Sequence, residues 1–253
     1  MKQFLIIVLF CGLIAPKPLL AWHSKGHQIV AEMAKSLLKK NILDSVQFYL
    51  DSTNFQQAAV WMDEVRTNPK FNYLKPMHYV NVAKDHTYVN SNEKNIINTL
   101  ETSIQKLKHR NGFNKADIKM QLLLLFHLIG DLHQPLHVAY GEDRGGNDIH
   151  LRYLKKKTNL HTLWDADIIA REHISLSTCF NKLKSMNEQD KMKAQHIDLL
   201  NWMNESRAHL IAVYDFKDNF IDAAYSAKSK NTIETQLALA ALRLAAVLED
   251  AFK

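Results

Sequence analysis

The chain has 253 residues and a formal charge of +6 at pH 7, and 47% of its residues are hydrophobic. This length allows one sizeable domain with an extensive core. The scarcity of Gly and Pro, with 7 and 5 residues, argues against a fold of many short strands and turns. Cysteine occurs only at Cys11 and Cys179, which excludes a scaffold stabilised by several disulfides. The positive charge suits an anionic substrate but does not identify one.

Residues 1–21 have the features of a secretory signal peptide. Lys2 gives a positive start, residues 4–14 are apolar, and Ala21 places a small residue at the cleavage position. The apolar run is too short for an ordinary transmembrane helix. Cleavage before Trp22 would leave residues 22–253 as one domain. We therefore predict a secreted or periplasmic protein with no stable membrane association.

The apolar residues that follow recur mostly at helical spacing. This spacing predicts helices around 29–38, 59–65, 97–107, 115–133, 161–172, 187–214 and 231–252. The segment 115–133 is apolar on most sides, so we expect it to lie at the centre of the molecule. Residues 147–154 alternate enough for a short strand or hairpin arm, and residues 155–157 predict a solvated lysine turn after it. The sequence therefore predicts a mainly α, single-domain fold with a short β hairpin.

A scattered set of imidazoles and carboxylates forms the main functional signal, together with the amine that cleavage would expose at Trp22. Such ligands hold catalytic zinc while leaving positions open for water or substrate. The set is too large for one ion. The nine candidate metal ligands are Trp22, His27, Asp63, His78, His127, Asp131, His137, His161 and Asp165.

Two pairs in this set have helical spacing. His127 and Asp131 are four residues apart, as are His161 and Asp165, so each pair can share one helix face. Pro135 predicts the end of the first helix, and a chain turning back there would bring His137 toward the same cavity. One such pair alone is more often a hydrogen-bonded core pair than a metal site. Spacing by itself does not assign which residues share a metal.

Several motifs occur in a fixed order along the chain. They are Trp22, Gly26-His27, WMDEVR at 61–66, HYVN at 78–81, HLIGDLHQPLH at 127–137, GGN at 145–147 and NLHTLWD at 159–165. In these motifs the chain resembles the zinc-dependent single-strand nucleases of the fungal and plant S1/P1 type and their bacterial relatives. The resemblance covers most of residues 22–172, and the C-terminal third matches only as helical scaffold. It implies a helical fold of the phospholipase C/P1 nuclease type, with a trinuclear zinc cluster in a cleft.

The resemblance also implies how the ligands divide among three zinc ions. The expected sets are Asp63, His78, His127 and Asp131 for one ion; the Trp22 amine and carbonyl, His27 and Asp131 for a second; and His137, His161 and Asp165 for the third.

The same resemblance implies an endonuclease that cleaves single-stranded RNA and DNA to products with 5′ phosphates and also acts on 3′ nucleotides. We expect the protein to be a monomer. Arg66, one helical turn after the catalytic ligand Asp63, would contact the phosphate; its alternative is a surface salt bridge. Tyr79 stands where the fungal enzymes have Phe and would stack on a base. Asn81 replaces an Asp that contacts the base in those enzymes, and Asn147 would line the same pocket. For Tyr79 and Asn147, the alternative is packing beside a metal site.

Two other functions remain open on the sequence. Zinc-dependent phospholipases C share the fold and the Trp ligand, but their last ligand is typically Glu, whereas this chain has Asp165. A non-enzymatic protein stabilised by zinc is the other alternative. It fits less well, because structural zinc sites are usually closed and rich in Cys.

Overall fold

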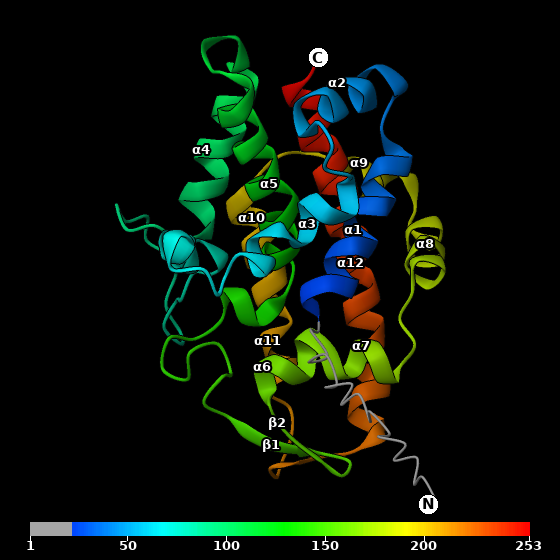
Figure 1. Cartoon of the computed structure of the whole chain (residues 1–253). Helices are drawn as coiled ribbons and strands as arrows, with labels where there is room; N and C mark the ends of the chain where they lie inside the picture. The colour runs from blue at the N-terminus through cyan, green and yellow to red at the C-terminus, as the bar shows by residue number, and fades with distance from the viewer. Residues whose placement is uncertain (1–21) are drawn as a thin grey trace, which may run out of the picture.

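The computed structural model describes residues 22–253, and the predicted signal peptide at 1–21 lies outside the described residues. Helices make up most of the described chain, and one small sheet lies at the bottom of the view in Figure 1. The predicted mainly α fold with a short hairpin is confirmed. The helices begin with α1 (Trp22–Leu37), α2 (Lys40–Leu50), α3 (Phe55–Glu64), η1 (Pro69–His78), α4 (Ile96–Lys108), η2 (Arg110–Gly112), α5 (Lys115–Leu132) and η3 (Pro135–Val138). They continue with α6 (Leu160–Thr162), η4 (Leu163–Asp167), α7 (Ile168–Arg171), α8 (Leu176–Ser185), α9 (Glu188–Ala194), α10 (Leu199–Ala208), α11 (Leu210–Val213) and α12 (Ala223–Ala251).

Helix α5 is the central element, as its composition predicted. Residues 121–136 are buried without interruption, and the helix contacts α1, α2, α3, α4, α10 and α12. Its start is fixed by Asn114, whose side-chain oxygen accepts a hydrogen bond from the backbone N–H of Asp117 at 2.9 Å. Despite its apolar sequence, neither α5 nor any other helix within 22–253 has the apolar length needed to cross a bilayer.

Helix α12 packs against α1, α5 and α8 (Figure 1). It was expected at 231–252 but begins earlier, because Asp222 caps it by accepting a hydrogen bond from the backbone N–H of Tyr225 at 2.9 Å. Its buried face carries alanines and leucines, which allow close approach to α1. These contacts place the beginning and the end of the described chain in one core.

The prediction of one continuous helix at 187–214 is wrong. The segment divides into α9, α10 and α11, and Asp198 is extended between the first two. Its side chain accepts a hydrogen bond from the N–H of Asn201 at 2.9 Å, which starts α10 as a separate helix. The predicted helix at 161–172 is present as α6, η4 and α7, with a π-helical turn at Leu163–Asp167.

The sheet has three strands in the order β2-β1-β3. Strands β1 (His150–Tyr153) and β2 (Lys156–Asn159) form the predicted hairpin, with Tyr153 opposite Lys156, and β3 (Phe220–Ile221) pairs parallel to β1. The predicted turn at 155–157 is wrong, because Lys156 and Lys157 belong to β2. The turn consists of Leu154, at φ 55°, and Lys155. The hairpin leads directly into α6, which carries part of the candidate site.

Candidate metal centre

Eight of the nine predicted ligands have side chains that the structure describes, and they come together from distant parts of the sequence. Trp22 begins α1, and its side chain lies outside the described part. Donor atoms of the eight residues fall into three groups, within each of which they lie less than 4.8 Å apart. The groups are His27, Asp63 and His127; His78, His127 and Asp131; and His137, His161 and Asp165.

The group of His78, His127 and Asp131 is the innermost. Asp131 Oδ2 lies 3.0 Å from His78 Nδ1 and 3.2 Å from His127 Nε2, and the two ring nitrogens are 3.1 Å apart. His127 and Asp131 lie on one face of α5, as their spacing predicted, while His78 is the last residue of η1. His127 and Asp131 are each only 1% exposed. Two separate elements therefore aim three donor atoms at one point.

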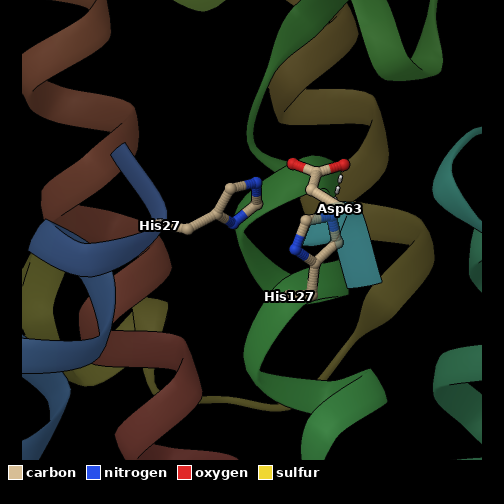
Figure 2. Close-up of side chains that lie close together, drawn as sticks. All are labelled: His27, Asp63 and His127. Atoms are coloured by element: carbon tan, nitrogen blue, oxygen red, sulfur yellow. Dashed lines mark ion pairs between the residues drawn. The ribbon is translucent and has the colours of Figure 1, made fainter. Parts of the chain in front are cut away.

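His27 and Asp63 approach the same region from α1 and α3 (Figure 2). The rings of His27 and His127 stack with centroids 4.0 Å apart, and Asp63 Oδ1 lies 3.9 Å from His127 Nε2. His27 Nε2 is also 3.2 Å from Asp131 Oδ1. A Cβ at Gly130 would lie 2.5 Å from His27 Nδ1, so the absence of a side chain there makes room for the imidazole.

Within this grouping, Asp63 lies with His27 and His127, whereas the resemblance placed it with His78, His127 and Asp131. The two sets overlap at His127 and are contiguous. The structure thus brings all of these side chains together, without dividing them among individual ions.

The third group contains the set expected for the third ion. His161 Nε2 lies 3.2 Å from Asp165 Oδ2, and His137 Nε2 lies 3.8 Å from Asp165 Oδ1. His137 Nδ1 is 3.6 Å from Asp131 Oδ1, so this group borders the group of His78, His127 and Asp131. Asn159 caps α6 by accepting a hydrogen bond from the N–H of Thr162 at 2.7 Å, and thereby fixes the turn that carries His161.

Three of the histidines are held in one orientation by backbone carbonyls. Nδ1–H of His127 donates to the carbonyl of Ala59, that of His137 to His78, and that of His161 to Gly145, each at 2.8 Å. A carbonyl only accepts, so the bond places the proton on Nδ1 and leaves Nε2 as the available donor atom. This is the usual arrangement around a metal-binding imidazole.

Gly145 has a geometric reason to be glycine. Its φ is 62°, in the left-handed region, and a Cβ would lie 2.4 Å from the carbonyl oxygen of Leu136. The turn presents the Gly145 carbonyl to His161 and packs against the chain next to His137. The Gly-Gly-Asn motif therefore orients a candidate ligand through its backbone.

The charges within the first group are unevenly distributed. Burial opposes protonation of His127, but the negative charges of Asp131 and Asp63 outweigh it and raise its pKa to about 9. Burial and the neighbouring His127 lower the pKa of the stacked His27 to about 4. One ring of the stacked pair is therefore charged at neutral pH while the other is neutral.

In the third group, burial and the neighbouring charges again shift the pKa values in opposite directions. Burial disfavours the charged form of His137, but Asp131 and Asp165 raise its pKa to about 10. Burial also opposes ionisation of Asp165, yet the charge of His161 and the hydrogen bond to His137 hold its pKa well below the usual range. The two buried carboxylates remain ionised, and within residues 22–253 their counter-charges are imidazolium groups.

This donor set fits zinc. Ligands at about 2.0–2.1 Å from a tetrahedral zinc ion lie about 3.3 Å from one another. The separations of 3.0–3.2 Å among His78, His127 and Asp131 are close to this value. In addition, His27 Nδ1 is buried and has no hydrogen-bond partner among the described residues. A divalent cation would compensate the burial of Asp131 and Asp165.

Gln134 lies within the HLIGDLHQPLH motif and is a further residue of the candidate site, for which the sequence predicted no role. It is fully buried, and its Nε2 donates to Asp165 Oδ1 at 2.5 Å while its Oε1 accepts from the N–H of Leu136 at 2.5 Å. Gln134 thus links the turn before His137 to Asp165. Its position between the candidate ligands Asp131 and His137 in DLHQPLH was the available signal.

The residues expected to bind substrate lie at more exposed positions. Arg66 follows the end of α3, is exposed, and forms no ion pair with a side chain of residues 22–253, so the salt-bridge alternative finds no support there. Tyr79 is 43% exposed and lines one hollow together with Asn81. Asn147 does not line that hollow; its side chain donates to the carbonyl of Arg144 at 2.9 Å.

Comparison with known proteins agrees with this geometry. The S1/P1 nuclease family model matches residues 22–253. Endonuclease 2 of Arabidopsis thaliana is 28% identical over 164 residues, which cover 58% of this chain and 56% of that protein. Nuclease P1 of Penicillium citrinum is 27% identical over 157 residues, 57% of each chain. Nuclease S1 of Aspergillus oryzae is 25% identical over 262 residues, covering 90% of this chain and 91% of that protein.

The chain thus spans little more than half the length of Endonuclease 2 and Nuclease P1 in these alignments, but nearly all of Nuclease S1. The match to the family model includes the C-terminal helices, which carry none of the motifs. With its three groups of His and Asp donors, the chain belongs to the zinc-dependent S1/P1 nuclease family.

Proposed function

We propose that this protein is a zinc-dependent endonuclease that hydrolyses phosphodiester bonds of single-stranded RNA and DNA. The observation that carries the proposal is the buried cluster of His and Asp donors, which lies beside the exposed Arg66 and Tyr79. Bound zinc would lower the pKa of a water molecule and polarise the phosphoryl oxygens. The family supports nucleic acid, rather than phospholipid, as the substrate.

The chain's own residues have distinct tasks in this proposal. Backbone carbonyls keep the Nε2 atoms of His127, His137 and His161 directed into the cluster. The guanidinium of Arg66, next to Asp63, offers two parallel donors to a phosphate and stabilises the charge that grows in the transition state.

Substrate selection would take place beside His78. The exposed ring of Tyr79 offers a face on which any base can stack, and Asn81 offers both a donor and an acceptor to the base edge. In a duplex the bases are already stacked, so a base must leave its neighbours before it can reach this ring. We therefore expect the enzyme to prefer single-stranded substrates over duplexes.

We further propose that residues 22–253 act as one monomeric domain, released by cleavage before Trp22 and located outside the cell or in the periplasm. The products would carry 5′ phosphates, and removal of 3′ phosphates from nucleotides would be a second activity. These points rest on the resemblance and on the features of residues 1–21. We propose three zinc ions, with the Trp22 amine and carbonyl among the ligands, and Asn147 near the base pocket.

The test is hydrolysis by zinc-loaded protein of single-stranded RNA, single-stranded DNA and phosphatidylcholine, assayed in parallel and with chelator controls. We expect zinc-dependent release of 5′-phosphorylated fragments. The variant Asp131→Asn should lose at least about 100-fold in kcat/KM while circular dichroism shows that it is folded. The matched control Asp218→Asn replaces an exposed carboxylate and should leave activity unchanged.

Other results would identify the alternatives. Cleavage of phosphatidylcholine without cleavage of nucleic acid would move the protein to the phospholipases C. Absence of turnover on all three substrates, with zinc measured in the sample, would favour the non-enzymatic zinc-stabilised protein.

A further inference from the structure

A second hollow is lined in part by η1, the helix that ends at the candidate ligand His78. It has a volume of about 540 Å³ and is bordered by η1, residues 90–94, α4 and α5. This volume is in the range of small-ligand sites. We call it the Tyr73 hollow, after the aromatic residue at its edge.

The lining of the Tyr73 hollow is cationic and aromatic. The Tyr73 side chain is 46% exposed, and the ammonium of Lys94 lies 5.6 Å from the centre of its ring. Lys106 is the second cation, and no Asp or Glu is among the lining residues. Neither lysine forms an ion pair with an acidic side chain in residues 22–253. Lys94 thus lies beside the Tyr73 ring, and Lys106, whose ammonium is 5.8 Å from the centre of the Phe113 ring, adds a second positive charge to the lining.

The floor and walls add apolar and hydrogen-bonding groups. Leu74 and Met77 are buried beneath the hollow, and Asn90 and Asn92 lie exposed at its edge. A planar base needs an apolar or aromatic surface for its face and polar groups for its edge. This hollow supplies both.

The Tyr73 hollow shares two lining residues with the proposed base site. The hollow of about 490 Å³ that contains Tyr79 and Asn81 shares Ser91 and Lys94 with it. Along the backbone, Met77 lines the Tyr73 hollow and Tyr79 lines its neighbour, with the candidate ligand His78 between them. Successive Cα atoms are about 3.8 Å apart, so the backbone positions of Met77 and Tyr79 are separated by at most about 8 Å. A single strand crossing η1 would meet both hollows.

We propose that the Tyr73 hollow is a distal subsite for the single strand, occupied by a nucleotide beyond the one that stacks on Tyr79. One base stacks on Tyr73, and Lys94 and Lys106 contact the flanking phosphates. Such a groove, with cations following the backbone and an aromatic platform for the bases, binds single strands with little sequence preference. This proposal rests on the proposed nuclease function and extends it to substrate length.

The test compares a decamer with a dinucleotide as substrate. Tyr73→Leu removes the stacking ring but keeps an apolar side chain, and Lys106→Gln removes one cation. Tyr73→Phe keeps a ring and serves as the control for the first. Lys184→Gln removes an exposed lysine on α8, outside both hollows, and serves as the control for the second.

We expect the ratio of kcat/KM for the decamer to that for the dinucleotide to fall about tenfold in Tyr73→Leu, as loss of one stacked base predicts. For Lys106→Gln, the slope of log KM against log salt concentration for the decamer should become shallower by about 0.7, the value for one phosphate contact on a single strand. Both control variants should match the unaltered protein.

Unchanged ratios and salt slopes, in a protein that cleaves single strands, would overturn the subsite and leave the nuclease function standing. A direct binding measurement separates the two proposals if no cleavage is found. For this, fluorescence anisotropy follows a labelled phosphorothioate decamer on the same variants. Weaker binding by Tyr73→Leu and Lys106→Gln alone would support the subsite even without hydrolysis, and equal binding by all variants would refute it.

Discussion

Gln134 is a buried amide that contacts the candidate metal centre without being one of its candidate ligands. It has no exposure to solvent, and its two polar ends bind Asp165 and the backbone of Leu136. A hydrogen bond to one carboxylate oxygen fixes the direction of the other, which faces His161. Such outer contacts commonly change metal affinity or activity by 10–100-fold when they are lost.

Replacing Gln134 with Met should therefore lower kcat by about 10–100-fold, because Asp165 would lose the donor that orients it. Zinc content and kcat/KM on a single-stranded oligonucleotide are the measurements. Gln236→Met, which replaces another buried amide on α12, is the control for loss of a core polar group. Full activity in the Gln134 variant would show that Asp165 is held by other contacts.

The titratable residues of the cluster predict how the metal-free protein depends on pH. His27 has a folded pKa of about 4, below its unfolded value of about 6.5. In that interval the unfolded state binds more protons, so stability rises with pH. His127 and His137 have raised pKa values of about 9 and about 10, so their stabilising contribution is complete below about 6.5 and is lost toward alkaline pH.

We therefore expect the chelated protein to be most stable near pH 6.5, with the free energy of unfolding decreasing on both sides. Urea denaturation at a series of pH values in the presence of chelator measures this. The zinc-loaded protein should instead gain stability from pH 6 to 8, since protons compete with the metal for imidazole. Parallel pH profiles for the two forms would contradict the assignment of these histidines as ligands.

At the scale of elements, the parts that could be predicted from sequence are those with strong local signals. Helix α5 was predicted almost to the residue, because its apolar run is long and is bounded by Asn114 and Pro135. The i, i+4 spacing correctly placed His127 and Asp131 on one face. Motifs carried the remaining candidate ligands, and the structure brings together the eight candidate ligands whose side chains it describes.

The elements that were missed depend on distant partners or on a single polar residue. Strand β3 has two residues and exists through its pairing with β1, far earlier in the chain. The break before α10 depends on the Asp198 cap inside a pattern that otherwise favours a continuous helix. The hydrogen bond from Gln134 to Asp165 and the Tyr73 hollow also depend on tertiary contacts, which the periodicity of the local sequence does not predict.

A buried arginine joins three helices behind the candidate centre. Arg243 of α12 is 2% exposed, donates from Nη1 to His133 Nε2 of the α5 terminus at 2.8 Å, and pairs with Glu205 of α10. His133 Nδ1–H donates to the carbonyl of Ile129 at 2.7 Å. Burial and the neighbouring Arg243 hold the pKa of His133 well below its usual range, so the ring remains a neutral acceptor.

Arg243→Met keeps the apolar stem but leaves the buried Nε2 of His133 without its donor. We expect a loss of about 1–3 kcal/mol in the free energy of unfolding, the usual cost of one unsatisfied buried group. Urea denaturation of the zinc-loaded protein measures it. Glu205→Gln should cost less, because the Glu205 side chain is 44% exposed. An equal or larger effect of Glu205→Gln would mean that the ion pair, rather than the bond to His133, provides the stability.

At the scale of the whole molecule, the candidate centre brings together elements that no disulfide connects within residues 22–253. Its donors come from α1, α3, η1, α5, η3, α6 and η4, and Cys179 is a buried free thiol. The hydrophobic core connects the same helices, but it leaves Asp131 and Asp165 buried as anions. Metal binding would therefore add stability where burial of these two carboxylates is unfavourable.

Removal of zinc should lower the melting temperature substantially. A site occupied at a thousandfold excess of metal over its Kd contributes about 4 kcal/mol, and each kcal/mol corresponds to about 2–4 °C for a domain of this size. We expect the midpoint to fall by about 10 °C or more in chelator, and to return when zinc is added back. Scanning calorimetry with metal analysis of each sample measures both steps. A midpoint that stays constant after verified removal of zinc would show that hydrogen bonds and imidazolium charges alone stabilise the buried carboxylates, and that the metal serves catalysis without contributing to the fold.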